Sequence, residues 1–175
     1  KHYPCVLTIA GSIAVEEPAF SRHKDYISIG AYAASAITAI TVQNTCGVTG
    51  IHPVPPSYVK GQIEAVMTDI VSAVKIGMIN DVEIVQVIAE SLKKFKPEFV
   101  VFDPVMVSTS GCKLMEDDAI EAITTLLMPL ASIITPNLSE TEVLTEADSQ
   151  IEMMKTASRE LLNYGCRAVL VKGGI

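Results

Sequence analysis

The sequence has no tryptophan, few aromatic residues and no cluster of basic side chains. Its 13 Lys and Arg residues face 20 Asp and Glu residues, which gives a net charge of −7. This balance argues against nucleic-acid binding, because phosphate backbones are bound by clustered cations. The 49% hydrophobic and 5% aromatic content suits an aliphatic α/β core. We expect one domain over residues 1–175, long enough to bury a real core.

Features of secreted and membrane proteins are also missing. The four cysteines are widely spaced and form no Cys-x-x-Cys, so we expect free thiols in a reducing cytoplasm. Residues 1–4 lead directly into strand-like residues, so we expect no signal peptide at this point. The longest uncharged run, residues 27–49, contains several hydroxyl and amide side chains. A buried strand with its approach therefore explains this run better than a membrane span.

Strand-like and helix-like segments alternate along the chain. Short apolar runs predict strands at residues 5–10, 33–42, 72–78, 99–102, 132–135 and 167–171. Apolar residues at helical spacing predict helices near residue 26, at 59–70, 81–95 and 118–130, from 139, and at 154–164. Residues 47–56, with three prolines, are expected to form a loop. The alternation indicates a mostly parallel sheet with helices on both faces.

Asp103 follows the apolar run Phe99-Val-Val-Phe102, which we expect to be a strand buried on both faces. Pro104 cannot donate to a sheet ladder, so this strand should end at Asp103. Ligands of open α/β sheets bind beyond the carboxyl ends of the strands, which makes Asp103 a candidate site residue. The alternative is an aspartate that only makes a turn hydrogen bond.

Other polar residues follow other predicted strands, and parallel strands bring their carboxyl ends to one edge. Asp103, Asn137 and Glu140 offer the oxygen atoms that Mg²⁺ prefers. Lys172, before two glycines, suits an anion, and Gln43 suits the edge of a heterocycle. Each residue also has a purely structural interpretation: Glu140, for example, could simply favour a helix N-terminus beside a Ser139-x-x-Glu142 capping box. The sequence contains neither of the common glycine-rich nucleotide motifs.

A series of motifs resembles the hydroxymethylpyrimidine/phosphomethylpyrimidine kinases of thiamine biosynthesis, which have the ribokinase-like fold. The motifs occur in order along nearly the whole chain: Leu7-Thr-Ile-Ala-Gly-Ser12, Ala36-Ile-Thr-Ala-Ile-Thr-Val-Gln-Asn-Thr45, Ala73-Val-Lys-Ile-Gly-Met78, Asp103-Pro-Val-Met-Val107, Ile134-Thr-Pro-Asn-Leu138 and Val169-Leu-Val-Lys-Gly-Gly174. The resemblance implies a three-layer αβα fold with a mostly parallel central sheet. It also implies an ATP- and Mg²⁺-dependent kinase that phosphorylates 4-amino-5-hydroxymethyl-2-methylpyrimidine and then its monophosphate.

The resemblance also assigns roles to individual residues. Gln43 would hold the pyrimidine, in a pocket lined by Gly11, Met78 and Val105. The metal and the phosphates of the nucleotide would lie among Asp103, Asn137, Glu140 and Lys172. Of these residues, Asp103 and Glu140 would be the metal ligands. The expected enzyme is a cytoplasmic homodimer that acts on a small molecule.

The sequence departs from the family pattern in two places. Residues 13–24 replace the family's glycine-rich segment and its substrate-contacting aspartate, and put Glu16 and Glu17 there instead. The family's Gly-Thr-Gly-Cys motif, with its catalytic residue, would lie beyond Ile175, so we expect residues 1–175 alone to be inactive. A pyridoxal or pyridoxine kinase is the alternative within enzymes. A non-catalytic module that keeps the pyrimidine pocket is the alternative outside them.

Overall fold

The computed structural model describes residues 4–12, 21–44, 47–67, 71–79, 81–106, 117–145 and 151–173. Its centre is a six-stranded sheet with the strand order β3-β2-β1-β4-β5-β6. The strands are β1 (Cys5–Ser12), β2 (Tyr32–Asn44), β3 (Gly47–Pro53), β4 (Val71–Ile76), β5 (Phe99–Phe102) and β6 (Ile133–Ile134). All neighbours are parallel except β2 and β3. The predicted mostly parallel sheet is confirmed.

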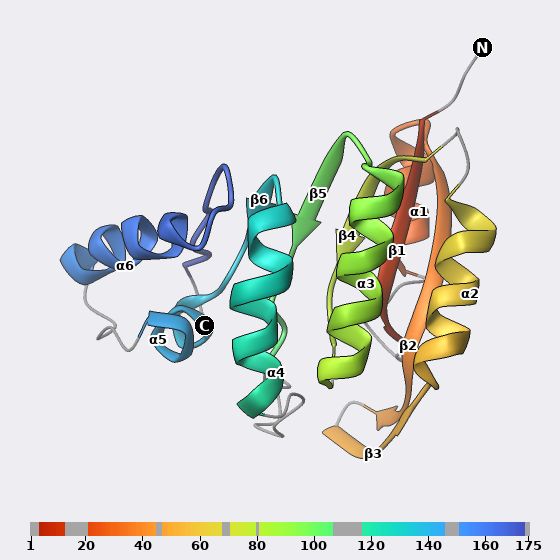
Figure 1. Cartoon of the computed structure of the whole chain (residues 1–175), viewed down its shortest axis with the longest axis horizontal. Helices are drawn as coiled ribbons and strands as arrows, with labels where there is room; N and C mark the ends of the chain where they lie inside the picture. Colours follow the sequence, from red (N-terminus) through yellow and green to blue (C-terminus); the bar gives the residue numbers. More distant parts are fainter. Residues whose placement is uncertain are drawn as a thin grey trace.

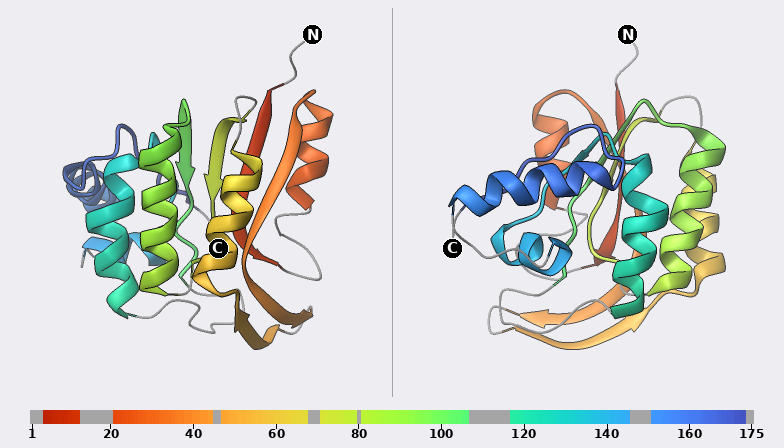
Figure 2. Two further views of the ribbon diagram at one scale, coloured as in Figure 1. Left: turned by 45° about the vertical axis from the view of Figure 1, so that its right-hand side comes forward. Right: turned by 60° about the vertical axis from the view of Figure 1, so that its left-hand side comes forward.

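Helices lie on both sides of this sheet, as predicted. They are α1 (Ser21–Ser28), α2 (Pro56–Val66), α3 (Val82–Phe95), α4 (Asp117–Ala122), α5 (Leu138–Thr145) and α6 (Ile151–Asn163). The helices α2, α3 and α4 lie side by side over one face (Figure 1), and α1 lies against the opposite face beside β2 (Figure 2). None of the described helices is long and apolar enough to cross a membrane.

The main core fills the space between the sheet and α2, α3 and α4. Leu7 and Ile9 of β1, Val74 and Ile76 of β4 and Phe102 of β5 are all buried in it. Because side chains alternate along a strand, the intervening residues point to the opposite face. Lys75 and Asp103 are therefore on the face away from this core.

The antiparallel strand β3 was not predicted. Residues 47–53 lack an apolar run and end in proline, which is why the sequence indicates a loop. They pair with the far end of β2, from Gly47 opposite Asn44 to Pro53 opposite Ala39. A proline and two glycines are tolerated there because β3 is the edge strand. As a result β2 continues through Gln43 and Asn44, which were predicted to follow it.

Three other strand predictions need correction. The first strand, predicted at residues 5–10, extends through Gly11 and Ser12. The strand β5 is not buried on both faces: Phe99 is 51% exposed, because it starts the strand on the face away from the core. Residues 167–171 do not form a full strand and make only isolated bridges, from Ile134 to Val169 and from Asn137 to Lys172.

The helices begin and end for local reasons. Asp81 caps α3 by accepting a hydrogen bond from the Ile84 amide at 2.9 Å, and Gly165, at φ +98°, follows α6 in the left-handed region. The helix predicted from residue 118 begins at Asp117, so Asp118 lies inside α4. The helix continues as a π-helical turn, η1 (Ile123–Leu127), and a 3₁₀ turn, η2 (Met128–Leu130).

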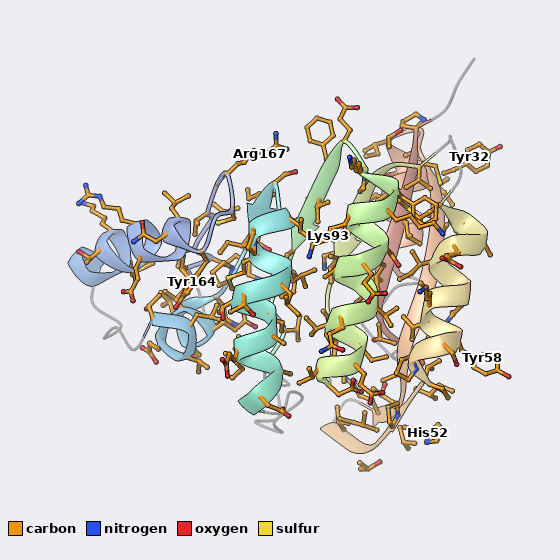
Figure 3. All side chains as sticks on the ribbon, viewed as in Figure 1. Tyr32, His52, Tyr58, Lys93, Tyr164 and Arg167 are labelled. Atoms are coloured by element: carbon orange, nitrogen blue, oxygen red, sulfur yellow. The ribbon has the colours of Figure 1, made fainter. Side chains whose placement is uncertain are left out.

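Two side chains at the start of the segment after α6 hold this segment beside β6. The Tyr164 hydroxyl donates to the Leu144 carbonyl of α5 at 3.1 Å, and the Arg167 guanidinium donates to Ser132 Oγ at 2.7 Å (Figure 3). The backbone amide of Lys172 then donates to the Pro136 carbonyl at 2.8 Å. These contacts bring Lys172 to the carboxyl end of the sheet.

Candidate active site

Asp103 lies at the carboxyl end of β5, where the sequence predicts it. Its backbone amide donates to the Ile76 carbonyl of β4 at 2.8 Å, which fixes its position relative to the neighbouring strand. Its own carbonyl accepts from the Val105 amide at 2.9 Å, across Pro104. This three-residue turn ends the strand and places Asp103 and Val105 close together.

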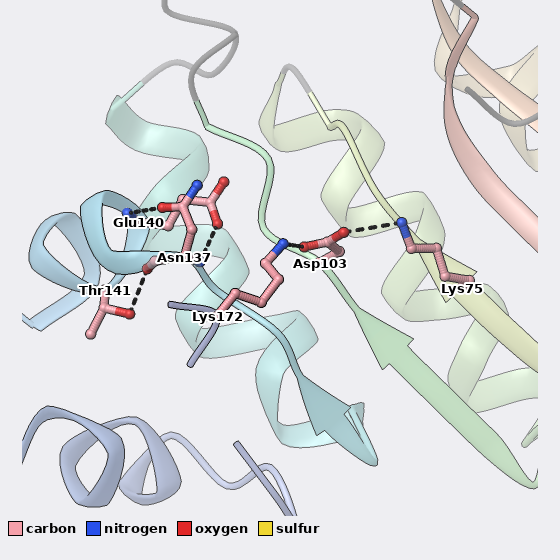
Figure 4. Close-up of polar contacts among 6 residues, drawn as sticks. All are labelled: Lys75, Asp103, Asn137, Glu140, Thr141 and Lys172. Carbon is pink, nitrogen blue, oxygen red and sulfur yellow. Dashed lines mark hydrogen bonds and ion pairs between the residues drawn. The ribbon is translucent and has the colours of Figure 1, made fainter. Parts of the chain in front are cut away.

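The Asp103 carboxylate is held between two lysines (Figure 4). Lys172 Nζ lies 2.7 Å from Oδ1, and Lys75 Nζ lies 3.2 Å from Oδ2. Burial by itself would raise the pKa of Asp103, but the two ammonium groups outweigh it and the pKa is lowered. The residue therefore carries a negative charge even though it is buried.

Glu140 and Asn137 cap α5 reciprocally (Figure 4). The Asn137 side-chain oxygen accepts from the Glu140 amide, and the Glu140 carboxylate accepts from the Asn137 amide, both at 2.8 Å. Asn137 is thus the N-cap and Glu140 the third helical residue of a capping box. The predicted helix start near Ser139 is confirmed, because α5 begins at Leu138. The capping box lies two residues before the predicted Ser139-x-x-Glu142 box.

Glu140 is buried, at 5% exposure. Burial raises the pKa of its carboxyl group, and the hydrogen bond from the Asn137 amide opposes this only in part. The parallel bridge between Asn137 and Lys172 joins this helix start to the Asp103 ion pair. The structure thus brings together all four residues that were predicted around the metal and phosphates.

An apolar cluster lies next to this charged group. Met78, just beyond β4, packs with Ala39 of β2, and Val105 packs against both. A Cβ added to Gly11 would lie 3.0 Å from the Met78 sulfur, so a larger residue would push the Met78 side chain away. Three of the four predicted pocket residues, Gly11, Met78 and Val105, therefore lie together.

Gln43, the fourth predicted pocket residue, is half-buried near the end of β2. Its register partner on β3 is Val48. Val48 packs against the same cluster as Met78. Gln43 is therefore next to the apolar cluster, at the point where the register between β2 and β3 shifts.

Lys75 is the site residue that the sequence interpretation missed. It stands in the middle of β4, between the buried residues Val74 and Ile76. A lysine inside an apolar strand is rarely buried without a partner, and this was the available signal. The partner, Asp103, is 28 residues away in the sequence.

Several predictions concern residues outside the described ranges. They include residues 13–20 of the replaced segment, Gly174 and the thiols Cys46 and Cys112. Cys5 and Cys166, which are described, are free and buried as predicted.

A separate depression of about 560 Å³ lies at the N-terminal ends of α2 and α3. Three acidic residues, Asp81, Glu83 and Asp118, line it together with prolines 53, 55 and 56 and Val54. The acidic lining would repel phosphate groups. The strand-end site, with two lysines, is therefore the better candidate for an anionic ligand.

Comparison with known families identifies this fold. The phosphomethylpyrimidine kinase family matches residues 24–175, and the chain belongs to this family. Membership confirms the predicted ribokinase-like, three-layer architecture. The members of this family are kinases, which transfer phosphoryl groups to small molecules.

Individual relatives agree with this assignment. Hydroxymethylpyrimidine/phosphomethylpyrimidine kinase of Rhizobium meliloti is 45% identical over 86% of this chain and 58% of its own length. The crystal structure of phosphomethylpyrimidine kinase from Clostridium difficile has 44% identity and a TM-score of 0.90, covering 98% of this chain and 75% of that one. Pyridoxal kinase from Staphylococcus aureus in complex with AMP-PCP has 29% identity and a TM-score of 0.87, covering 98% and 63%. The chain spans from 32% to 64% of the length of the curated relatives.

Proposed function

We propose that the protein phosphorylates 4-amino-5-hydroxymethyl-2-methylpyrimidine and then its monophosphate with ATP, in thiamine biosynthesis. The observation that carries this proposal is the turn from Asp103 to Val105. It joins a charged group of Asp103 and two lysines to an apolar cluster around Met78. A kinase for a hydroxymethyl heterocycle requires this combination, because the flat ring and the phosphates must meet at one point.

The charged half of the site suits the phosphates of a nucleotide. Lys172 is 43% exposed and can reach an anion outside the protein surface. Phosphoryl transfer depends mainly on positioning and on neutralising the charge of the transferred group. In this proposal Lys172 binds a nucleotide phosphate, and Asn137 and Glu140 hold the turn beside it.

A magnesium ion fits this site only together with the nucleotide. No group of three or more His, Cys, Asp or Glu side chains among the described residues could hold a metal by itself. Mg²⁺ typically binds through one or two carboxylates plus substrate phosphates. Asp103 and Glu140 are the carboxylates that would hold it, and the ion would supply further neutralisation of phosphate charge.

The apolar half of the site suits the pyrimidine ring. Met78 and Val105 would contact its faces, Gly11 would let it approach the backbone, and Gln43 would donate to and accept from its edge. The pyridoxal kinases are structural neighbours at 28–30% identity. The phosphomethylpyrimidine kinase from Clostridium difficile is closer, at 44%, which favours the pyrimidine.

The test is a kinase assay of the complete gene product with ATP and Mg²⁺. We expect phosphorylation of the hydroxymethylpyrimidine and of its monophosphate, and much weaker use of pyridoxal. Gln43→Ala should raise the KM for the pyrimidine by an amount equivalent to about 1–3 kcal/mol and leave the KM for ATP almost unchanged. Preferred use of pyridoxal would contradict the substrate assignment. Pyrimidine binding without phosphorylation would identify a binding module and not a kinase.

We also infer a homodimer in the cytoplasm. Ile40 and Val42 of β2 expose 52% and 64% of their surface, and contact with a second copy would cover them. The free thiols Cys5 and Cys166 are consistent with a reducing compartment. Sedimentation of the complete protein tests the first inference, and a monomer mass would contradict it. Cell fractionation tests the second.

A further inference from the structure

The two lysines that hold Asp103 differ in burial and in support. The Lys75 side chain is 12% exposed and the Lys172 side chain 43% exposed. Each uses a different carboxylate oxygen, Oδ2 for Lys75 and Oδ1 for Lys172. The two ammonium groups therefore do not share an acceptor atom.

The backbone of Lys75 is fixed on both sides. In β4, Lys75 is in register with Thr8 of β1 and with Val101 of β5. Its ammonium group lies 3.8 Å from the position that a Cβ on Gly77 would take, so the side chain runs close along its own strand. Lys75 is thus built into the sheet.

Lys172 is supported differently. Its residue makes an isolated bridge to Asn137, and its ammonium group is the more exposed of the two. A long, flexible side chain of this kind can change partners by rotation about its own bonds. It can reach an anion that binds beside Asp103.

We propose that Lys75 is a positioning residue that keeps the Asp103 carboxylate paired and in place, so that Lys172 can move from Asp103 to the phosphates of the nucleotide. A buried charge that loses its partner is strongly destabilised. With Lys75 present, Asp103 keeps an ammonium partner when Lys172 leaves. This inference rests on the proposed kinase function.

The proposal predicts a specific dependence on metal. Without the charge of Lys75, the departure of Lys172 leaves Asp103 without either described ammonium partner. A magnesium ion that enters with the nucleotide can compensate for this loss, but a metal-free nucleotide cannot. Removing the charge should therefore weaken metal-free binding more than metal-bound binding.

The experiment measures the affinity of the complete protein for the analogue AMP-PCP by calorimetry, with excess Mg²⁺ and with EDTA. In Lys75→Gln the ratio of the metal-free Kd to the magnesium-bound Kd should rise at least about tenfold over wild type. Lys75→Arg, which keeps the charge, should restore a ratio near the wild-type value. Lys94→Gln is the matched control, because it removes the exposed 2.8 Å ion pair with Glu64 and should leave the ratio unchanged.

A folded Lys75→Gln protein that binds AMP-PCP with the wild-type ratio overturns the inference alone. If wild type binds no AMP-PCP with or without Mg²⁺, the kinase proposal falls and the inference falls with it. Should Lys75→Gln fail to fold, urea unfolding of Lys172→Gln decides. A midpoint near wild type supports Lys75 as the fixed partner, and a Lys172→Gln protein that also fails to fold overturns it.

Discussion

Glu140 has two assigned tasks, and two substitutions separate them. It caps α5 through the Asn137 amide, and in the proposed function its charge helps to hold Mg²⁺ with the nucleotide. Glu140→Gln keeps an oxygen that can accept the capping hydrogen bond but removes the charge. Glu140→Ala removes both.

The structure sets the size of each effect on stability. Loss of the cap in Glu140→Ala should cost about 1 kcal/mol, and loss of one buried methylene adds about 0.8 kcal/mol. We therefore expect the free energy of unfolding to fall by about 2 kcal/mol. Glu140→Gln should lose little, because glutamine also serves in a capping box. Burial raises the pKa of Glu140, so a neutral amide also avoids the cost of burying an ionised group.

Urea unfolding and steady-state kinetics of the complete protein measure the two tasks separately. We expect Glu140→Gln to keep wild-type stability while kcat/KM for ATP with Mg²⁺ falls by about 10–100-fold. Wild-type kinetics in Glu140→Gln would limit Glu140 to capping and remove it from the nucleotide site. Equal stability of Glu140→Gln and Glu140→Ala would refute the cap itself.

Three further predictions concern other parts of the molecule. The lysines lower the pKa of Asp103, so the stability that its charge contributes is present above its unfolded-state pKa and is lost as pH falls through the folded-state value. The difference in unfolding free energy between wild type and Asp103→Asn should therefore shrink on acidification from about pH 6 to pH 3. A constant difference would contradict the ion pairs. Gly11→Ala places a Cβ 3.0 Å from the Met78 sulfur and should raise the KM for the pyrimidine by the equivalent of about 1–3 kcal/mol; an unchanged KM removes Gly11 from the pocket. Gly165→Ala, at φ +98°, should lower the unfolding free energy by about 1–2 kcal/mol. The control Gly61→Ala, in α2 with open space at its Cβ, should raise the unfolding free energy by up to about 1 kcal/mol. Equal effects of the two substitutions would refute the strain at Gly165.

The sequence was sufficient to predict the parts of the fold that depend on local patterns. Helix α3 shows this best, since its periodicity, its Asp81 cap and its last-turn lysines, Lys93 and Lys94, are all local. The position of Asp103 at a strand end was also predictable, because Pro104 ends the strand whatever surrounds it. Parallel topology then brings the strand ends together without any knowledge of side-chain contacts.

The other features depend on partners that are distant in the sequence. Strand β3 is defined by its pairing with the far end of β2, and its own residues give no strand signal. Two overlapping capping boxes, Asn137–Glu140 and Ser139–Glu142, are compatible with the sequence, and the hydrogen bonds form in the first of them. Lys75 became a site residue only when β4 and β5 were placed in register.

The strand order has a consequence for how the chain is made. Each strand after β1 pairs with at least one strand that precedes it: β2 with β1, β3 with β2, β4 with β1, β5 with β4, and β6 with β5. When a ribosome releases the chain from its N-terminus, every new strand finds an edge already formed and never has to insert between two paired strands. The sheet can therefore grow outward from β1 in step with translation, and the strand that carries Lys75 is in place before Asp103 emerges.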